Sequence, residues 1–240
     1  YSAYTSIKNC TALTSKDYAA EMRRKISADF VTPSIMIKPT DLAPYESDQT
    51  THFSVVDKEG NAVSNTYTIN MNYGSGLVAE GTGVLMNNEM DDFSAKPGVP
   101  NAFGLVGGDA NAIQPGKRPL SSMTPTIVLK DGKTWLVTGS PGGARIITTT
   151  LQVVLNMIDH GMNVAEASTA PRIHHQWLPD ELRVEEGISI DTIRLLQAKG
   201  HVIALKDAMG STQSIMRDPA SGALYGASDP RRPDAATLGY

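Results

Sequence analysis

The sequence changes character within the stretch Asp48-Gln49-Thr50-Thr51-His52-Phe53-Ser54-Val55-Val56-Asp57. Residues 39–47 before it are polar and interrupted by proline, which is typical of a linker, whereas residues 50–56 have the composition of a β-strand. Threonine is a weak nucleophile unless a base activates it, and one such base is the free α-amine of the same residue. We therefore predict that the chain is cut between Gln49 and Thr50, and that Thr50 becomes a catalytic N-terminal residue.

The turn-forming residues 57–61 join this strand to a second β-type run, so the two should pair as a hairpin. If Asp57 lies opposite Ala62, antiparallel pairing places Thr50 opposite about Ile69. Side chains alternate along a strand, so Thr68 and Asn70 share a face. They would lie beside Thr50 even if the register shifted by one residue. These residues are the first candidates for a site around Thr50.

Two other interpretations of the hairpin stay open at this point. His52 shares a face with Thr50 in a regular strand, which makes it a rival for the role of base. A hairpin rich in Thr, Ser and Asn can also simply be solvated. The adjacent His174 and His175 point to opposite faces of a strand, so they are not expected to hold a metal together.

The order of the predicted elements is strands, then helices, then more strands. This order favours stacked layers of helix and sheet over a parallel βαβ sheet. Asp131-Gly132 is a strong hairpin signal between two short strands. We predict helices at 15–26, with Ser15 as the N-cap, at 145–161, at 163–170, with Asn163 as the N-cap, and at 191–199. Strands are predicted at 84–88, 126–129, 134–138, 202–205, 213–216 and 224–227. The long loop at residues 96–117, rich in glycine and proline, is expected to be functional or mobile.

Composition narrows the classes of function. The net charge is −4 and basic residues do not cluster, which argues against a nucleic-acid partner. No apolar run approaches the ~18 residues that cross a membrane. The single cysteine, Cys10, allows no internal disulfide. The first residue is Tyr1 and no signal peptide is evident, so we expect a piece of a longer product.

Three further motifs carry residue types suited to chemistry. Glu89, Asp91 and Asp92 form an acidic cluster for a cationic group, and their spacing does not match a calcium loop. The hydroxyl pair Ser121-Ser122 can hold a carboxylate. Gly142-Gly143 lies between a strand and a helix, where backbone N–H groups can stabilise an oxyanion. Each motif also has a plain alternative, namely a solvated acidic turn, an ordinary loop and a tight turn.

Together these motifs resemble the γ-glutamyltranspeptidase family, also called glutathione hydrolases. The resemblance is carried by residues 50–55, 87–94, 117–123 and 139–143, and it covers residues 50–240, which are similar to the small catalytic subunit. Residues 1–49 resemble the C-terminal tail of the large subunit and a processing linker. The resemblance implies an α+β fold, the four-layer αββα sandwich of N-terminal-nucleophile hydrolases.

The resemblance also implies a role for each motif. Thr50 is the nucleophile and its freed α-amine is the base. Thr68 forms a hydrogen bond with Thr50. Gly142 and Gly143 form the oxyanion hole. The substrate α-amino group is held by Asn70, Glu89 and Asp92, and the α-carboxylate by Ser121 and Ser122. Residues 97–108 resemble a lid, in which this chain has Phe103 where bacterial relatives often carry tyrosine. A family arginine that binds the carboxylate belongs to the large subunit and is absent here.

The implied activity is γ-glutamyl transfer and hydrolysis on glutathione and related compounds, through a γ-glutamyl-threonine acyl-enzyme. It follows autocatalytic cleavage before Thr50, and water or an amino acid or dipeptide accepts the acyl group. No metal or organic cofactor is expected. The implied partner is the large subunit of the same precursor, and the implied location is periplasmic or secreted. The alternatives are another N-terminal-nucleophile amidase, such as a cephalosporin-acylase-like enzyme, and a non-catalytic binding module with the same fold.

Overall fold

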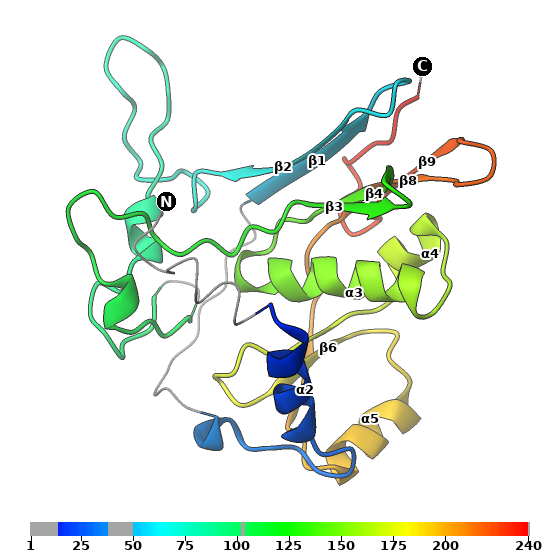
Figure 1. Cartoon of the computed structure of the whole chain (residues 1–240). Coiled ribbons are helices and arrows are strands. Elements are labelled where there is room, and N and C mark those ends of the chain that lie inside the picture. Colours follow the sequence, from blue (N-terminus) through cyan, green and yellow to red (C-terminus); the bar gives the residue numbers. More distant parts are fainter. Residues whose placement is uncertain (1–13, 38–49, 102–103, 240) are drawn as a thin grey trace.

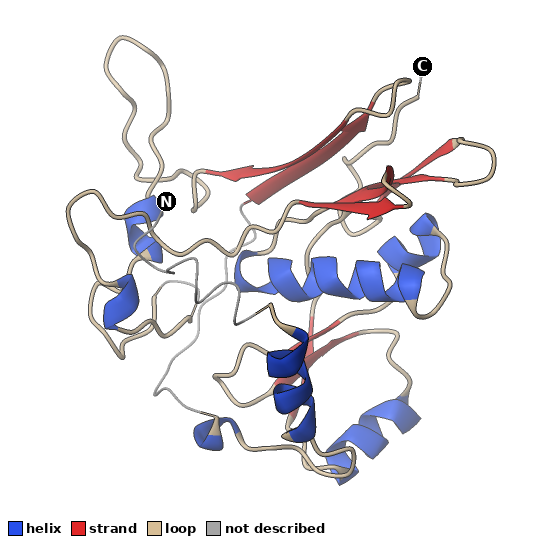
Figure 2. Ribbon diagram, viewed as in Figure 1, coloured by secondary structure: helices blue, strands red, loops and turns tan. Residues whose placement is uncertain are grey.

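The computed structural model of the chain describes residues 14–37, 50–101 and 104–239. Within them, two β-sheets lie against one another and helices cover one side of the stack (Figures 1 and 2). A smaller sheet with its own helices lies below. The fold therefore mixes helices and mainly antiparallel sheets, as the sequence predicts.

The predicted hairpin is present, with β1 at Thr50–Val56 and β2 at Ala62–Thr68. Its register pairs Thr50 with Thr68, so the expected pairing with Ile69 was wrong by one residue. The turn explains the shift, because Asp57 pairs with Asn61 instead of Ala62. The Asp57 N–H donates to the Asn61 carbonyl (3.0 Å), and the Asp57 carboxylate accepts from the Asn61 N–H (2.8 Å).

The second sheet has the order β3-β4-β8-β9 and is antiparallel throughout. Asp131 and Gly132 both have left-handed φ values, 52° and 73°, as a tight hairpin turn with the twist of the strands requires. All four strands were predicted. Their bounds are Thr126–Lys130, Lys133–Thr138, Gln213–Arg217 and Leu224–Ser228 for β3, β4, β8 and β9.

The two sheets pack through their inner faces. Ser54 Oγ donates to the Gln213 carbonyl (2.8 Å) and Ser64 Oγ donates to the Thr138 carbonyl (2.9 Å), which ties the hairpin to β8 and β4. On the other side of the second sheet lie α3 (Ile146–Ile158) and α4 (Val164–Thr169) (Figure 1). The buried core between sheet and helices is formed by Leu136, Val153, Met157, Val164, Ala167 and Ala227.

The outer face of the hairpin is apolar and exposed. Phe53 is 41% and Tyr67 56% exposed, and Val55 and Val63 are also exposed. The layers supplied by the described residues are thus helix, sheet and sheet. The fourth layer of the expected αββα sandwich would cover this face.

The smaller sheet has the order β5-β6-β7, with β5 at Ile173–His174, β6 at Leu182–Glu185 and β7 at Ile203–Lys206. Strands β6 and β7 are parallel and are connected through α5 (Ile190–Ala198). Of these elements, the sequence predicted only β7 and α5.

The predicted first helix is α2 (Lys16–Arg24), and its Ser15 side chain accepts from the Tyr18 N–H (3.1 Å) as the expected N-cap.

The predicted strand at 84–88 is wrong. Residues 71–88 form an irregular arm whose two legs are joined by single contacts, such as the Val78–Leu85 bridge. Gly81 and Gly83 have left-handed φ values of 74° and 71°, which breaks regular pairing. The long loop contains one element of regular structure, the short helix η3 (Asp109–Asn111).

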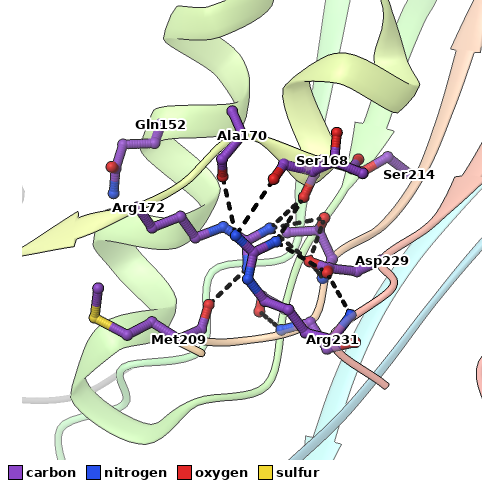
Figure 3. Close-up of polar contacts among 12 residues, drawn as sticks. Gln152, Ser168, Ala170, Arg172, Met209, Ser214, Asp229 and Arg231 are labelled. Carbon is purple, nitrogen blue, oxygen red and sulfur yellow. Dashed lines mark hydrogen bonds and ion pairs between the residues drawn. The ribbon is translucent and has the colours of Figure 1, made fainter. Parts of the chain in front are cut away.

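Charged side chains that come from β6 and from the segments before β5 and after β9 form a network, part of which is drawn in Figure 3. Its members are Arg172, Glu185, Asp229 and Arg231, which we call the buried arginine network. Arg172 pairs with Asp229 and donates to the carbonyls of Met209 (2.6 Å) and Ser168 (2.8 Å). Arg231 binds both Glu185 (Nε to Oε1, 3.0 Å) and Asp229 (Nη1 to Oδ1, 3.1 Å). Every charge in this network is therefore matched by an opposite charge.

Candidate active site

Thr50 is the first residue of β1 and is buried, with 7% of its surface exposed. Its backbone partner across the hairpin is Thr68, and cross-strand partners project from the same face of a sheet. The Thr50 carbonyl accepts from Arg232 Nη1 (3.4 Å). The structure thus brings Thr50 and Thr68 together as predicted. The side-chain bond between them and the cleavage after Gln49 stay predictions, since Gln49 lies outside the described residues.

Asn70 follows β2 and redirects the chain toward the acidic residues. It has a left-handed φ of 75° and is buried. Its N–H donates to Thr68 Oγ1 (2.9 Å) and its Nδ2 donates to the Asn88 carbonyl (3.2 Å). Asn88 in turn donates through Nδ2 to Asp91 Oδ2 (2.7 Å). Asn70 therefore links the hairpin that begins at Thr50 to the acidic residues, a position consistent with its expected role.

The acidic turn is the short helix η2 at Glu89–Asp92. Burial raises the pKa of Asp92 to about 7, helped by a hydrogen bond that protonated Asp92 donates to Glu89 and by the negative charges of Glu89 and Asp91. An ammonium group bound here would relieve this repulsion between like charges. Across residues 14–37, 50–101 and 104–239, no three His, Cys, Asp or Glu side chains gather closely enough to hold a metal ion.

Ser121 and Ser122 lie in the irregular segment directly before β3. Ser121 is exposed, and its Oγ accepts from the Met123 N–H (3.2 Å). The N–H of the preceding residue, Leu120, donates to Asn111 Oδ1, and Asn111 Nδ2 donates to the Asp92 carbonyl. The structure therefore connects the predicted hydroxyl pair to the predicted acidic turn through one side chain.

Gly142 and Gly143 connect β4 to α3 through the short helix η4 (Gly143–Arg145). Their φ values are 133° and 55°, a backbone region that favours glycine. A Cβ on Gly142 would also lie 3.4 Å from the Gly210 Cα. The predicted glycine turn at a strand-to-helix junction is present. Its role as an oxyanion hole stays a prediction.

His52 lies on the buried face that Thr50 occupies, as predicted, but both its ring nitrogens have hydroxyl partners. Nδ1 lies 2.7 Å from Thr66 Oγ1 and Nε2 lies 3.1 Å from Ser54 Oγ. Burial lowers the pKa of His52 to about 4, so the ring is neutral at ordinary pH. A buried ring engaged at both nitrogens is suited to a structural role, which favours the α-amine of Thr50 as the base.

The predicted lid segment folds back on itself. The Gly98 N–H donates to the Gly107 carbonyl (3.0 Å) and the Asn101 N–H donates to the Leu105 carbonyl (2.9 Å). A cavity of about 300 Å³ lies between this segment and the acidic turn, and its lining includes Asp92, Asn111 and Leu105. Phe103 lies outside the described residues, so its expected contact with the site stays a prediction.

Sequence reasoning missed the asparagines that arrange this site. Asn88 stands within the motif quoted for the resemblance, yet its bond from the Met71 N–H (N to Oδ1, 3.0 Å) depends on the arm folding back, whereas its bond to Asp91 is local. Asn111 gave no signal, because its partners lie 19 and 9 residues away in a loop without regular pattern.

Comparison with known proteins gives a consistent set of relatives. A family model described as gamma-glutamyltranspeptidase matches residues 2–239. The chain is 68% identical over 229 residues, 95% of its length, to the glutathione hydrolase proenzyme of Escherichia coli K12. It spans 39% of the length of that relative.

Solved structures confirm the predicted α+β fold of N-terminal-nucleophile hydrolases. A crystal structure of an acivicin-inhibited gamma-glutamyltranspeptidase superposes with a TM-score of 0.73 and 59% identity, and covers 76% of this chain and 98% of that one. A cephalosporin acylase from Bacillus halodurans superposes with a TM-score of 0.74 and 30% identity, over 91% of this chain and 37% of that one.

Proposed function

Because the chain belongs to the gamma-glutamyltranspeptidase family, we propose that it carries the catalytic part of an enzyme that transfers and hydrolyses γ-glutamyl groups. The single observation that carries the proposal is the position of Thr50. Thr50 is a buried residue at the start of β1, pairs with Thr68 across the hairpin, and is linked through Asn70 and Asn88 to an acidic turn. A nucleophile and a site for a cationic head group are thus joined by one continuous set of bonds.

In the proposed reaction, Thr50 Oγ attacks the γ-glutamyl carbonyl and its free α-amine takes the proton. The N–H groups of Gly142 and Gly143 would stabilise the oxyanion that forms. The amine leaves, for example cysteinylglycine from glutathione, and Thr50 retains the acyl group. Water then gives glutamate, or the amine of an amino acid or dipeptide gives a new γ-glutamyl compound.

The head group of the substrate would be held by two separate sets of residues. Asn70, Glu89 and Asp92 take the α-ammonium, because they lie where negative charge is concentrated. Ser121 and Ser122 take the α-carboxylate. A bound ammonium would supply Asp92 with the compensating positive charge that its neighbours lack.

We infer that residues 1–49 end a large subunit and that residues 50–240 form the small subunit of the same precursor. The relative from Escherichia coli is named a proenzyme, and autoprocessing is described for the acivicin-inhibited structure. The exposed apolar face of the hairpin, with Phe53 and Tyr67, supports a partner that covers it. A periplasmic or secreted location is the one we propose. The helices of residues 14–37, 50–101 and 104–239 are too short or too polar to span a bilayer.

A cephalosporin-acylase-like amidase is the second candidate, favoured by the superposition on the Bacillus halodurans enzyme. The head group of the substrate provides a test between the two candidates. A γ-glutamyl anilide carries an α-ammonium, and a glutaryl anilide does not. Preference for the γ-glutamyl compound supports the proposed function, and preference for the glutaryl compound supports the alternative.

Processing provides the direct test of the nucleophile. The full precursor is expressed, and its products are examined by intact mass and N-terminal sequencing. We expect a chain that begins Thr-Thr-His-Phe-Ser, and a single uncut chain for Thr50→Ala. Thr51→Ala is the matched control, because Thr51 is exposed and should leave cleavage intact. Cleavage of the Thr50→Ala precursor at the same bond would refute the role of Thr50.

A further inference from the structure

Asn111 lies between the two parts of the site that hold the substrate head group, and only 3% of it is exposed. Its Nδ2 donates to the Asp92 carbonyl (2.6 Å), and its Oδ1 accepts from the Leu120 N–H (3.0 Å). Leu120 immediately precedes Ser121. One amide group therefore holds the backbone of the acidic turn and the backbone of the hydroxyl pair at a fixed distance.

The backbone of Asn111 is held as firmly as its side chain. Its N–H donates to the Gly108 carbonyl (3.0 Å), and its carbonyl accepts from the Ser94 N–H (2.9 Å). Ser94 is two residues beyond Asp92. An amide is suited to this place, because it carries a donor and an acceptor on neighbouring atoms. An aspartate side chain at this position would offer no donor to the Asp92 carbonyl.

We propose that Asn111 is a positioning residue that sets the separation between the α-ammonium site at Asp92 and the α-carboxylate site at Ser121-Ser122. This inference rests on the proposed function. The ammonium and carboxylate of an α-amino acid share one carbon, so their spacing is fixed. A site that binds both must hold its two halves at the matching distance, and a small displacement weakens only ligands that use both halves.

This selectivity can be measured with three anilides and the processed full-length enzyme. The γ-glutamyl compound uses both halves, the glutaryl compound lacks the ammonium, and the 4-aminobutyryl compound lacks the carboxylate. For Asn111→Ala we expect KM for the γ-glutamyl compound to rise roughly tenfold to a hundredfold, with kcat changed less than about threefold. For the other two compounds kcat/KM should change less than about threefold, because neither ligand bridges the halves.

Two further variants make the test decisive. Asn111→Asp keeps the shape and loses the donor, and it should show the same selectivity even if Asn111→Ala does not fold. Asn163→Ala is the control, since Asn163 makes comparable bonds to the N–H groups of Ala165 and Glu166 at the start of α4. It should lower stability without changing the ratio between substrates.

The outcomes separate the inference from its premise. An equal loss of kcat/KM on all three anilides would show that Asn111 is merely structural and would overturn the inference. A parent enzyme with no preference for the γ-glutamyl compound over the two others would instead overturn the proposed function. A loss confined to the γ-glutamyl compound supports both.

Discussion

The acidic turn and the buried arginine network both gather charged side chains away from water, but their charges are balanced differently. Burial alone would raise the pKa of Asp229, yet the charge of Arg172 and the hydrogen bonds from Arg172, Thr212 and Arg231 together outweigh it, and the pKa is lowered. Asp92 is also partly buried, and its neighbours Glu89 and Asp91 are carboxyl groups that raise its pKa further, to about 7. The buried arginine network is balanced within the described residues, whereas the acidic turn would gain its counter-charge from a bound cation.

This difference separates charges that stabilise a fold from charges that are suited to a ligand. A buried charge with a built-in partner contributes to the folded state, and removing its partner is costly. Strongly shifted pKa values without such a partner are common at functional sites. We therefore expect substitutions in the buried arginine network to change stability, and substitutions in the acidic turn to change activity.

The largest effect is expected for Arg172→Ala, which leaves Asp229 buried without its main partner. The side chains of Arg172 and Asp229 are 2% and 0% exposed, so the loss should be about 3–5 kcal/mol of unfolding free energy. Arg194→Ala is the control, since the Arg194–Asp191 pair is 72% and 85% exposed and should contribute less than about 0.5 kcal/mol. Urea unfolding of the two precursors measures both. Similar midpoints would contradict the importance of the network.

The second effect concerns activity. Asp92→Ala should lower kcat/KM for a γ-glutamyl anilide by roughly tenfold to a few hundredfold, because a charged hydrogen bond to the ammonium is lost. Stability should be unchanged or slightly higher, because a repulsive carboxylate is removed. Cleavage before Thr50 should continue, as it involves no glutamyl ligand. If glutaryl and γ-glutamyl substrates lose equally, Asp92 does not recognise the ammonium.

The sequence predicted those features of the structure that depend on local patterns. The caps at Ser15 and Asn163 and the Asp131-Gly132 turn each depend on neighbours within a few residues, and all three are present. The motif around Asp92 was found in the same way. These features could be predicted because their partners are close in the sequence.

The parts that were missed depend on distant partners. Strand β6 is buried along its whole length, although Arg183 and Glu185 are charged and suggest an exposed segment. Glu185 is buried because Arg231, 46 residues away, pairs with it. Asn111 was missed for the same reason. The hairpin register was wrong because the choice between Asn61 and Ala62 as the partner of Asp57 depends on turn geometry.

A third effect follows from the pKa of Asp92. The native protein keeps a proton on Asp92 that the unfolded chain has lost, so between the ordinary value of 3.8 and about 7 the stability contributed by this group falls as the pH rises. The ammonium of the substrate binds the ionised form. We therefore expect kcat/KM for the γ-glutamyl anilide to rise with pH, at most about tenfold per unit, up to about pH 7.

The α-amine of Thr50 also titrates near this range, so the assignment needs a control. Turnover of a glutaryl anilide depends on the α-amine of Thr50 but not on the ammonium site at Asp92. Its pH profile should therefore lack the limb due to Asp92. Asp92→Asn should remove the same limb from the γ-glutamyl profile. A limb that persists unchanged in Asp92→Asn would assign it to another group.

The smallest expected effect concerns two hydroxyl groups, one near the acidic turn and one near the buried arginine network. Ser94 next to the acidic turn and Ser168 in the surroundings of Arg172 are both buried, and neither Oγ has a hydrogen-bond partner among the described residues. Removing an unpaired buried hydroxyl removes a desolvation cost, so Ser94→Ala and Ser168→Ala should each raise the unfolding free energy by up to about 1 kcal/mol. Thermal unfolding and γ-glutamyl anilide turnover are measured on both variants. If Ser168→Ala leaves turnover unchanged but Ser94→Ala lowers it, the Ser94 hydroxyl serves the substrate, and the acidic turn is incomplete in its polar contacts as well as in its charge.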